Sequence, residues 1–203
     1  NCFSWNVTAD DIRNAADAFE KTGLADHGWS YINIDDFWQN KPTSWMKDLH
    51  GPVRDENGKI NTNKRFPDMK GLVDYLHSKG FKAGIYSSPG PKTCGGCEGS
   101  WQHEIQDAKS YAEWGFDYLK YDFCNFYGVD PKRAYFTMSQ ALRATGRDIL
   151  FAACNWGWGD KNGCPDVEGS YAPGEQPPSE WLKACGVHTY RSTTDINDTW
   201  EKT

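Results

Sequence analysis

The most restrictive feature of this sequence is residues 117–124, where ionisable side chains interrupt an apolar strand pattern. The segment reads Asp-Tyr-Leu-Lys-Tyr-Asp-Phe-Cys and follows a helix-like stretch, residues 104–114, that Gly115 closes. Because side chains on a strand alternate between its faces, Lys120 and Asp122 share one face. Burying both costs roughly several kcal/mol unless they are paired or used. Lys120 and Asp122 therefore form either a purely structural ion pair or part of a functional site at the end of a strand.

Strand and helix patterns alternate along the chain, which predicts a parallel α/β architecture. Residues 1–6 are interpreted as the tail of a strand or a loop. Thr8 caps the first helix, with Asp11 completing an Asp variant of the capping box, and Gly23 ends it. Further strands are predicted at residues 31–34, 82–87, 117–124, 149–154 and 187–191, and further helices at 67–80, 104–114, 131–146 and around Trp181.

Acidic residues at several strand ends favour a (β/α)8 TIM barrel over a doubly wound sheet, because barrel sites lie at the carboxyl ends of the strands. A full barrel needs eight units, typically in about 250 residues. The 203 residues hold at most six, so we expect a partial barrel, about strands 1/2 to 6, within one catalytic domain over residues 1–203. The polar loop of residues 39–65 is long enough to indicate a functional lid.

The composition of the chain excludes some classes of binding partner and indicates the cellular compartment. The net charge is −6, and the 22 Lys and Arg residues are scattered, which argues against nucleic acid or an anionic membrane as a partner. No stretch approaches the roughly 18 apolar residues of a membrane span, and the sequence shows no signal peptide. The seven Cys residues indicate an oxidising compartment. The oligomeric state is left open.

Two separated carboxylates, Asp122 and Asp195, are candidates for a catalytic pair. Glycoside hydrolysis uses one carboxylate that stays ionised and another that holds a proton for the leaving oxygen. Lys120 beside Asp122 is expected to keep that carboxylate charged, as a nucleophile requires. In a parallel barrel the residues at the strand ends meet at one mouth; they are Asp35, Asp36, Tyr86, Lys120, Asp122, Cys154, Asn155, Trp156, Arg191 and Asp195.

Two other groups leave alternatives open. Asp35 and Asp36 could bind sugar hydroxyls or a Mg²⁺ or Ca²⁺ ion; nearby aromatic residues favour sugar. Cys94 and Cys97 have redox or zinc spacing, but no second pair of matching spacing accompanies them. No metal or other cofactor is predicted.

Several segments in order resemble glycoside hydrolase family 27, the α-galactosidases and α-N-acetylgalactosaminidases. The resemblance covers nearly all of the chain. It is carried by Tyr-Ile-Asn-Ile-Asp-Asp-Phe-Trp at 31–38, Arg-Phe-Pro at 65–67, His-Ser-Lys-Gly-Phe-Lys-Ala-Gly-Ile-Tyr at 77–86, Trp-Gly-Phe-Asp-Tyr-Leu-Lys-Tyr-Asp at 114–122, Cys-Asn-Trp-Gly at 154–157 and Arg-Ser-Thr-Thr-Asp-Ile at 191–196.

The resemblance implies a retaining exo-α-galactosidase that releases terminal α-linked galactose by double displacement on a (β/α)8 barrel. Asp122 would be the nucleophile and Asp195 the acid/base. A disulfide between Cys94 and Cys124 would lie beside the nucleophile. The implied substrate-binding residues are Asp35, Asp36, Tyr86, Lys120, Asn155, Trp156 and Arg191.

The sequence also departs from the family pattern. Asn155 stands where many members have Glu, which leaves α-N-acetylgalactosaminidase and β-L-arabinopyranosidase activity as alternatives. Phe37 replaces a Cys of some members, and Cys164 could pair with Cys185. The chain starts after the family's first-strand segment and lacks the C-terminal β-sandwich. A sugar-binding barrel without turnover and a metal-dependent isomerase or aldolase are further alternatives. The expected location is secreted, periplasmic or lysosomal.

Overall fold

A five-stranded parallel sheet forms the centre of the protein. The computed structural model describes residues 4–44, 46–125, 128–157, 174 and 176–192. Each strand pairs with the next strand in the sequence, giving the order β1-β2-β3-β4-β5. The strands are β1 (Tyr31–Asn33), β2 (Lys82–Ser87), β3 (Tyr118–Asp122), β4 (Leu150–Cys154) and β5 (Thr189–Tyr190). The predicted strand at 117–124 is therefore shorter than expected.

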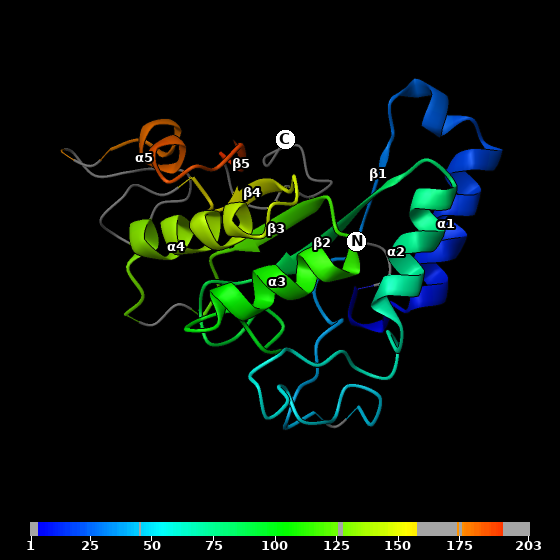
Figure 1. Ribbon diagram of the computed structural model, residues 1–203, viewed down its shortest axis with the longest axis horizontal. Helices are drawn as coiled ribbons and strands as arrows, with labels where there is room; N and C mark the ends of the chain where they lie inside the picture. Colours follow the sequence, from blue (N-terminus) through cyan, green and yellow to red (C-terminus); the bar gives the residue numbers. More distant parts are fainter. Residues whose placement is uncertain (1–3, 45, 126–127, 158–173, 175, 193–203) are drawn as a thin grey trace, which may run out of the picture.

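The helices form one layer around the outside of the sheet (Figure 1). Each helix contacts the next one along the chain, as expected when all of them cover the same face of the sheet. A doubly wound sheet would place helices on both faces, so this arrangement is a partial barrel. The helices are α1 (Ala9–Lys21), α2 (Met69–Ser78), α3 (Glu104–Trp114), α4 (Pro131–Ala144) and α5 (Pro178–Ala184), with 3-10 turns η1 (Ser4–Asn6) and η2 (Leu24–His27).

Short polar side chains cap the first turns of α1, α2 and α4. Thr8 and Asp11 form the predicted capping box of α1, with reciprocal bonds between each side chain and the other residue's backbone N–H. Asp68 caps α2, and Asp130 caps α4 ahead of Pro131. Such caps stabilise a helix by about 1 kcal/mol each. Residues 4–6 form the turn η1 rather than the tail of a strand, while residues 1–3 lie outside the described part.

The two faces of the sheet differ in chemistry. The side facing the helices is apolar, and Leu119 and Tyr121 of β3 are fully buried there. On the inner side, Gly84 leaves room for the side chains of Asn33 and Tyr118. A Cβ on Gly84 would lie 1.9 Å from Oδ1 of Asn33 and 3.0 Å from Cδ1 of Tyr118. Apolar burial therefore stabilises one face, and the other is left for polar side chains.

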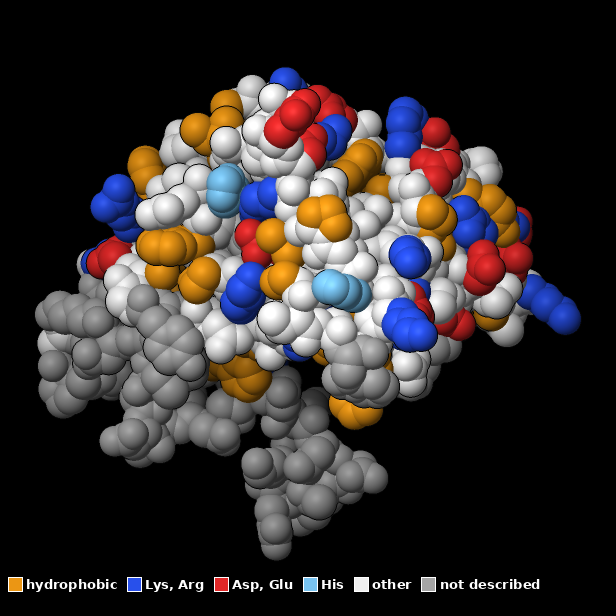
Figure 2. Space-filling model, turned by 90° about the horizontal axis from the view of Figure 1, so that it is seen from below, with side chains coloured by type: hydrophobic (Ala, Val, Ile, Leu, Met, Phe, Trp, Pro, Cys, Tyr) orange, Lys and Arg blue, Asp and Glu red, His pale blue; other side chains and the backbone are white. Residues whose placement is uncertain are grey.

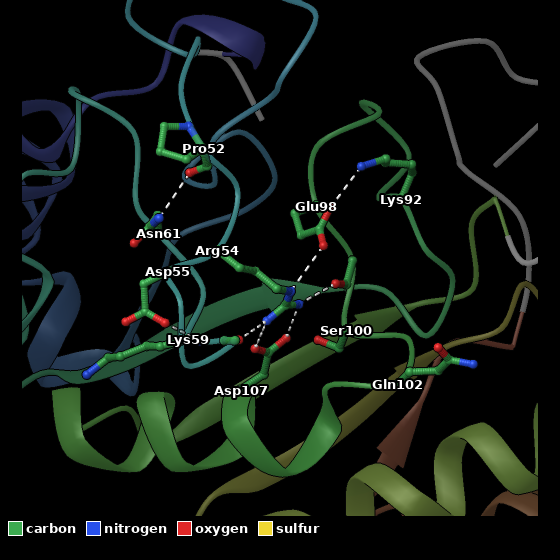
Figure 3. A network of polar contacts seen from close by, with 12 residues as sticks. Pro52, Arg54, Asp55, Lys59, Asn61, Lys92, Glu98, Ser100, Gln102 and Asp107 are labelled. Atoms are coloured by element: carbon green, nitrogen blue, oxygen red, sulfur yellow. Dashed lines mark hydrogen bonds and ion pairs between the residues drawn. The ribbon is translucent and has the colours of Figure 1, made fainter.

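The loop at residues 39–65, expected to be a lid, is anchored at its centre by Arg54 (Figure 3). The Arg54 guanidinium makes two bonds to the fully buried Asp107 of α3, at 2.7 and 3.0 Å. It also donates to Oε1 of Glu98 at 3.1 Å and to the Gly99 carbonyl at 2.8 Å. Lys92 reaches the second oxygen of Glu98 at 2.8 Å. The loop is thus bound to α3 and to the loop that follows β2.

The surface carries mixed charge. On the face drawn in Figure 2, Lys and Arg side chains are interspersed with Asp and Glu side chains. Among the described residues, no helix has the length and apolar character that crossing a membrane requires.

Candidate active site

Polar side chains gather at the carboxyl edge of the sheet. Tyr86 of β2 lies in register with Lys120 of β3, and Asp122 with Cys154 of β4. Because parallel strands end at the same edge, these side chains share one mouth. The predicted site residues that the structure describes at this edge are Asp35, Asp36, Tyr86, Lys120, Asp122, Asn155, Trp156 and Arg191. Asp195 lies outside the described residues.

Asp122 is nearly buried, with 5% of its surface exposed, and lies among hydrogen-bond donors. The Tyr86 hydroxyl donates to its Oδ2 at 3.0 Å, and Trp156 Nε1 donates to Oδ1 at 3.2 Å. Burial raises the pKa of Tyr86 well above its usual range, so its hydroxyl keeps its proton and remains a donor. Both bonds favour the ionised carboxylate.

The pKa of Asp122 differs from the sequence-based expectation. Burial raises it above the ordinary Asp value, and the positive charge of Lys120 only partly opposes that rise. The nearest carboxylate partner of Lys120 is Asp35: Lys120 Nζ lies 3.0 Å from Asp35 Oδ2. The Lys120–Asp122 ion pair was one of the two alternatives that the sequence left open; in the structure Lys120 pairs with Asp35, and its charge acts on both carboxylates.

Asp36 is nearly buried, with 6% of its surface exposed. Its Oδ1 accepts the backbone N–H of Phe37 at 2.8 Å, and its Oδ2 that of Gly95 at 2.7 Å. The neighbouring Asp35 accepts the backbone N–H of Asp36 at 2.8 Å and the Lys120 ammonium. Each of the four carboxylate oxygens accepts a bond from a protein donor, and the Lys120 ammonium 3.0 Å from Asp35 would repel a cation, which disfavours the alternative of a Mg²⁺ or Ca²⁺ ion at this pair. Burial raises the pKa of Asp36.

Trp156 and Arg191 form the other side of the mouth. The Arg191 guanidinium carbon lies 4.7 Å from the centre of the Trp156 ring, a cation–π contact. Trp156 has a φ of 61°, a left-handed conformation that bulky residues rarely adopt. Such strained residues cluster at functional sites. Here the backbone turns the ring so that its Nε1 reaches Asp122.

A disulfide joins Cys94, in the loop after β2, to Cys124, just after β3. This confirms the pairing that the family resemblance implies and excludes a Cys94–Cys97 pair. Cys94 Sγ lies 3.4 Å from Asp122 Oδ2. Cys97 and Cys185 are free, buried thiols, while Cys164 lies outside the described residues.

Among the described residues, one group has metal-ligand proximity: Cys94, Asp122 and Cys124. Its two sulfurs are joined in the disulfide and are not the thiolates that bind metals well. The group is better explained as a covalent bond that fixes the loops on either side of the Asp122 carboxylate.

Sequence reasoning missed the parts played by Gly95 and Phe37. A Cβ on Gly95 would lie 2.4 Å from Phe37 Cζ and 2.9 Å from Asp36 Oδ2, so only glycine lets the backbone approach both groups. Phe37 has a φ of 77°. The adjacent glycines at 95 and 96 were a signal for close backbone approach, whereas no local pattern predicts a left-handed Phe.

The parallel sheet, its single layer of helices and its polar mouth are those of a partial (β/α)8 barrel. The chain belongs to the α-galactosidase family: the family model described as "Alpha galactosidase A" matches residues 1–203.

Similar proteins named α-galactosidase come from bacteria and from plants. The chain is 43% identical to α-galactosidase A of Cellvibrio japonicus and 41% identical to the α-galactosidase of Coffea arabica, each over 202 residues. Each match covers 98% of this chain but only 43% and 46% of the two relatives. The crystal structure of α-galactosidase I from Mortierella vinacea superposes with a TM-score of 0.79 at 34% identity, over 97% of this chain and 44% of that one. The chain thus spans less than half the length of these relatives.

Proposed function

We propose that this chain forms part of a retaining exo-α-galactosidase that hydrolyses terminal α-linked galactose from oligosaccharides or glycoconjugates. The observation that carries the proposal is Asp122: a nearly buried carboxylate at a strand end, held by Tyr86 and Trp156 in a member of the α-galactosidase family. A nearly buried carboxylate held by two hydrogen-bond donors does not contribute to apolar packing. It does suit a nucleophile that must be held ionised in front of the anomeric carbon of a sugar.

In the first step of this reaction, Asp122 attacks the anomeric carbon and the glycosidic bond breaks, while Asp195 donates a proton to the leaving oxygen. In the second step, Asp195 removes a proton from water, which displaces Asp122 and releases galactose with its original anomeric configuration. The donors from Tyr86 and Trp156 hold Asp122 in place and favour its ionised form. The partner role of Asp195 rests on the family resemblance.

The sugar would lie over the charged and aromatic groups of the mouth. The Lys120–Asp35 pair is open, with 33% and 37% of the two side chains exposed, so it keeps capacity for sugar hydroxyls. Arg191 offers further donors, and the faces of Tyr86 and Trp156 suit the C–H surface of a pyranose. Asp36 would act mainly by holding the backbone at Gly95, given its bonds. The disulfide fits the expected secreted, periplasmic or lysosomal location.

Replacing the nucleophile tests the proposal. In the full-length protein, Asp122→Ala should lower nitrophenol release from an aryl α-galactoside by more than about a thousandfold, because the covalent step is lost. Asp74→Ala, which removes an exposed carboxylate on α2, is the matched control and should leave turnover intact. Galactose binding by an unmutated protein that never cleaves the glycoside would instead support a sugar-binding barrel.

Two further assays separate the remaining alternatives. Loss of activity in EDTA would support a metal-dependent isomerase or aldolase. Parallel assays on an α-galactoside, an α-N-acetylgalactosaminide and a β-L-arabinopyranoside would rank the sugars. This ranking tests the consequence of Asn155, which is 1% exposed directly after β4.

A further inference from the structure

A hollow of about 360 Å³ lies between the starts of α3 and α4, two helices that lie side by side (Figure 1). One wall comes from the end of the loop after β2 and the first turn of α3, and the other from the segment before α4 and its first two turns. None of the site residues described above lines it. Its volume is that of small-molecule sites, which start at about 300 Å³.

Trp101 provides the aromatic surface of this hollow. Two other tryptophans near α3, Trp38 and Trp114, contact each other and Tyr111 inside the protein. Trp101 joins no such ring contact among the described residues, and 43% of it is exposed. Its indole face is therefore open to a ligand.

The backbone at Gln102 brings two consecutive side chains into the hollow. In an extended strand Trp101 and Gln102 would point to opposite sides, yet both line the same hollow. Gln102 has a φ of 64°, a left-handed conformation that residues other than glycine seldom adopt. Such strain persists where the surroundings fix it, and it clusters at functional sites. The Gln102 side chain points away from the network around Arg54 (Figure 3).

Charged side chains complete the lining, and two of them are held by local bonds. One oxygen of Glu104 accepts the Gln102 backbone N–H at 3.3 Å, and one oxygen of Asp130 accepts that of Arg133 at 2.6 Å. Both carboxylates are thus fixed in position. The Arg133 guanidinium and the Gln102 amide are exposed and bond to no other side chain in the described part of the chain. Their donors remain available to a ligand.

This lining suits a neutral ligand that is rich in hydroxyl groups. Two carboxylates against one guanidinium disfavour a phosphate or another anion, and the guanidinium repels a metal ion. A wholly apolar ligand would leave the charged groups without partners. A pyranose satisfies both requirements, because its C–H face packs on an indole and its hydroxyls donate to carboxylates and accept from guanidinium and amide groups.

We infer that this hollow is a second saccharide site, which binds a pyranose unit of a neutral polysaccharide independently of the mouth that holds Asp122. Trp101 would pack on the apolar face of the sugar, and Glu104 and Arg133 would bond its hydroxyls. The loops that form the hollow follow the carboxyl ends of β2 and β3, so the polymer would be held at the end of the barrel where the mouth opens. The choice of a galactose-bearing polymer as ligand rests on the proposed function.

Affinity electrophoresis tests the site without turnover. The full-length Asp122→Ala protein should be retarded in native gels that contain galactomannan, with excess free galactose added to occupy the mouth. Adding Trp101→Ala should raise the dissociation constant about three- to tenfold, because an aromatic contact is lost, and Trp101→Tyr should recover most of the binding. Trp29→Ala is the matched control: Trp29 is 60% exposed but precedes β1, at the opposite end of the strand. No retardation, or an unchanged constant in Trp101→Ala, overturns the inference.

Turnover separates this inference from the proposed function. In the protein with Asp122 intact, Trp101→Ala should lower kcat/KM on galactomannan about three- to tenfold and leave kcat/KM on an aryl α-galactoside unchanged. An equal fall on both substrates would overturn the second site, even though the galactosidase assay succeeds. Absence of turnover in the unmutated protein would overturn the proposed function, while the electrophoresis would still decide the inference.

Discussion

Two ion pairs connect distant parts of this chain and differ in how completely they are satisfied. The Arg54 and Asp107 side chains are 8% and 0% exposed, and Arg54 also bonds Glu98 and backbone carbonyls. The Lys120 and Asp35 side chains are 33% and 37% exposed at the mouth of the sheet. A closed network of this kind serves the fold. An open pair at strand ends keeps bonding capacity for a ligand.

Breaking the closed pair should have the largest effect on stability. Arg54→Met leaves Asp107 buried without its cation, and removing one partner of such a pair costs about 3–5 kcal/mol. Denaturant unfolding of the full-length protein measures this loss. Lys59→Met is the control, because Lys59 and Glu113 form a pair in which both side chains are nearly half exposed. A loss in Arg54→Met no larger than in Lys59→Met would show that the network is not structural.

Breaking the Lys120–Asp35 pair should have little effect on stability and a large effect on activity. Lys120→Met should change unfolding free energy by less than about 1 kcal/mol, because solvent screens a partly exposed pair. Its kcat/KM on an aryl α-galactoside should nevertheless fall about 10- to 150-fold, the loss of one hydrogen bond from a charged donor. A stability loss as large as that of Arg54→Met, with unchanged turnover, would make this pair structural too.

A smaller and pH-dependent effect is expected at Tyr86. Under the proposed function Asp122 must be ionised to attack the sugar, so activity should be lost as pH falls through the pKa of this carboxyl group. Burial already raises that pKa, and the Tyr86 hydroxyl opposes the rise. Tyr86→Phe should therefore move the acid limb of the kcat/KM profile to higher pH. Ser110→Ala, which removes a buried hydroxyl in α3 that bonds within its own helix, should leave that limb in place. A shift to lower pH in Tyr86→Phe would contradict the assignment.

Local signals in the sequence were enough to predict most of the fold. The capping box at Thr8 and the closing Gly115 depend on residues near them in the chain, so α1 and α3 were predicted closely. Period-two alternation placed Lys120 and Asp122 on one face. The alternation of strands and helices favoured a partial parallel barrel, and the five-stranded parallel sheet with sequential strand order agrees with it.

Long-range pairing was not predictable. Lys120 lies two residues from Asp122 but pairs with Asp35, 85 positions away. Arg54 and Asp107 are separated by 53 positions, and neither shows a pattern that would identify its partner. The pKa of Asp122 was expected to fall because the nearby cation was visible in the sequence, whereas the extent of burial was not. Burial and partner choice are properties of the assembled barrel.

The disulfide between Cys94 and Cys124 makes the position of the Asp122 carboxylate depend on the redox conditions of the cell that produces the protein. It closes a loop across 30 positions and lies against the carboxylate of Asp122. A bacterial cytosol keeps such sulfurs apart by reduction, whereas an oxidising compartment joins them. Recombinant material from the two sources would share a sequence and differ in how firmly the Asp122 carboxylate is held, so the choice of expression host is itself a structural variable.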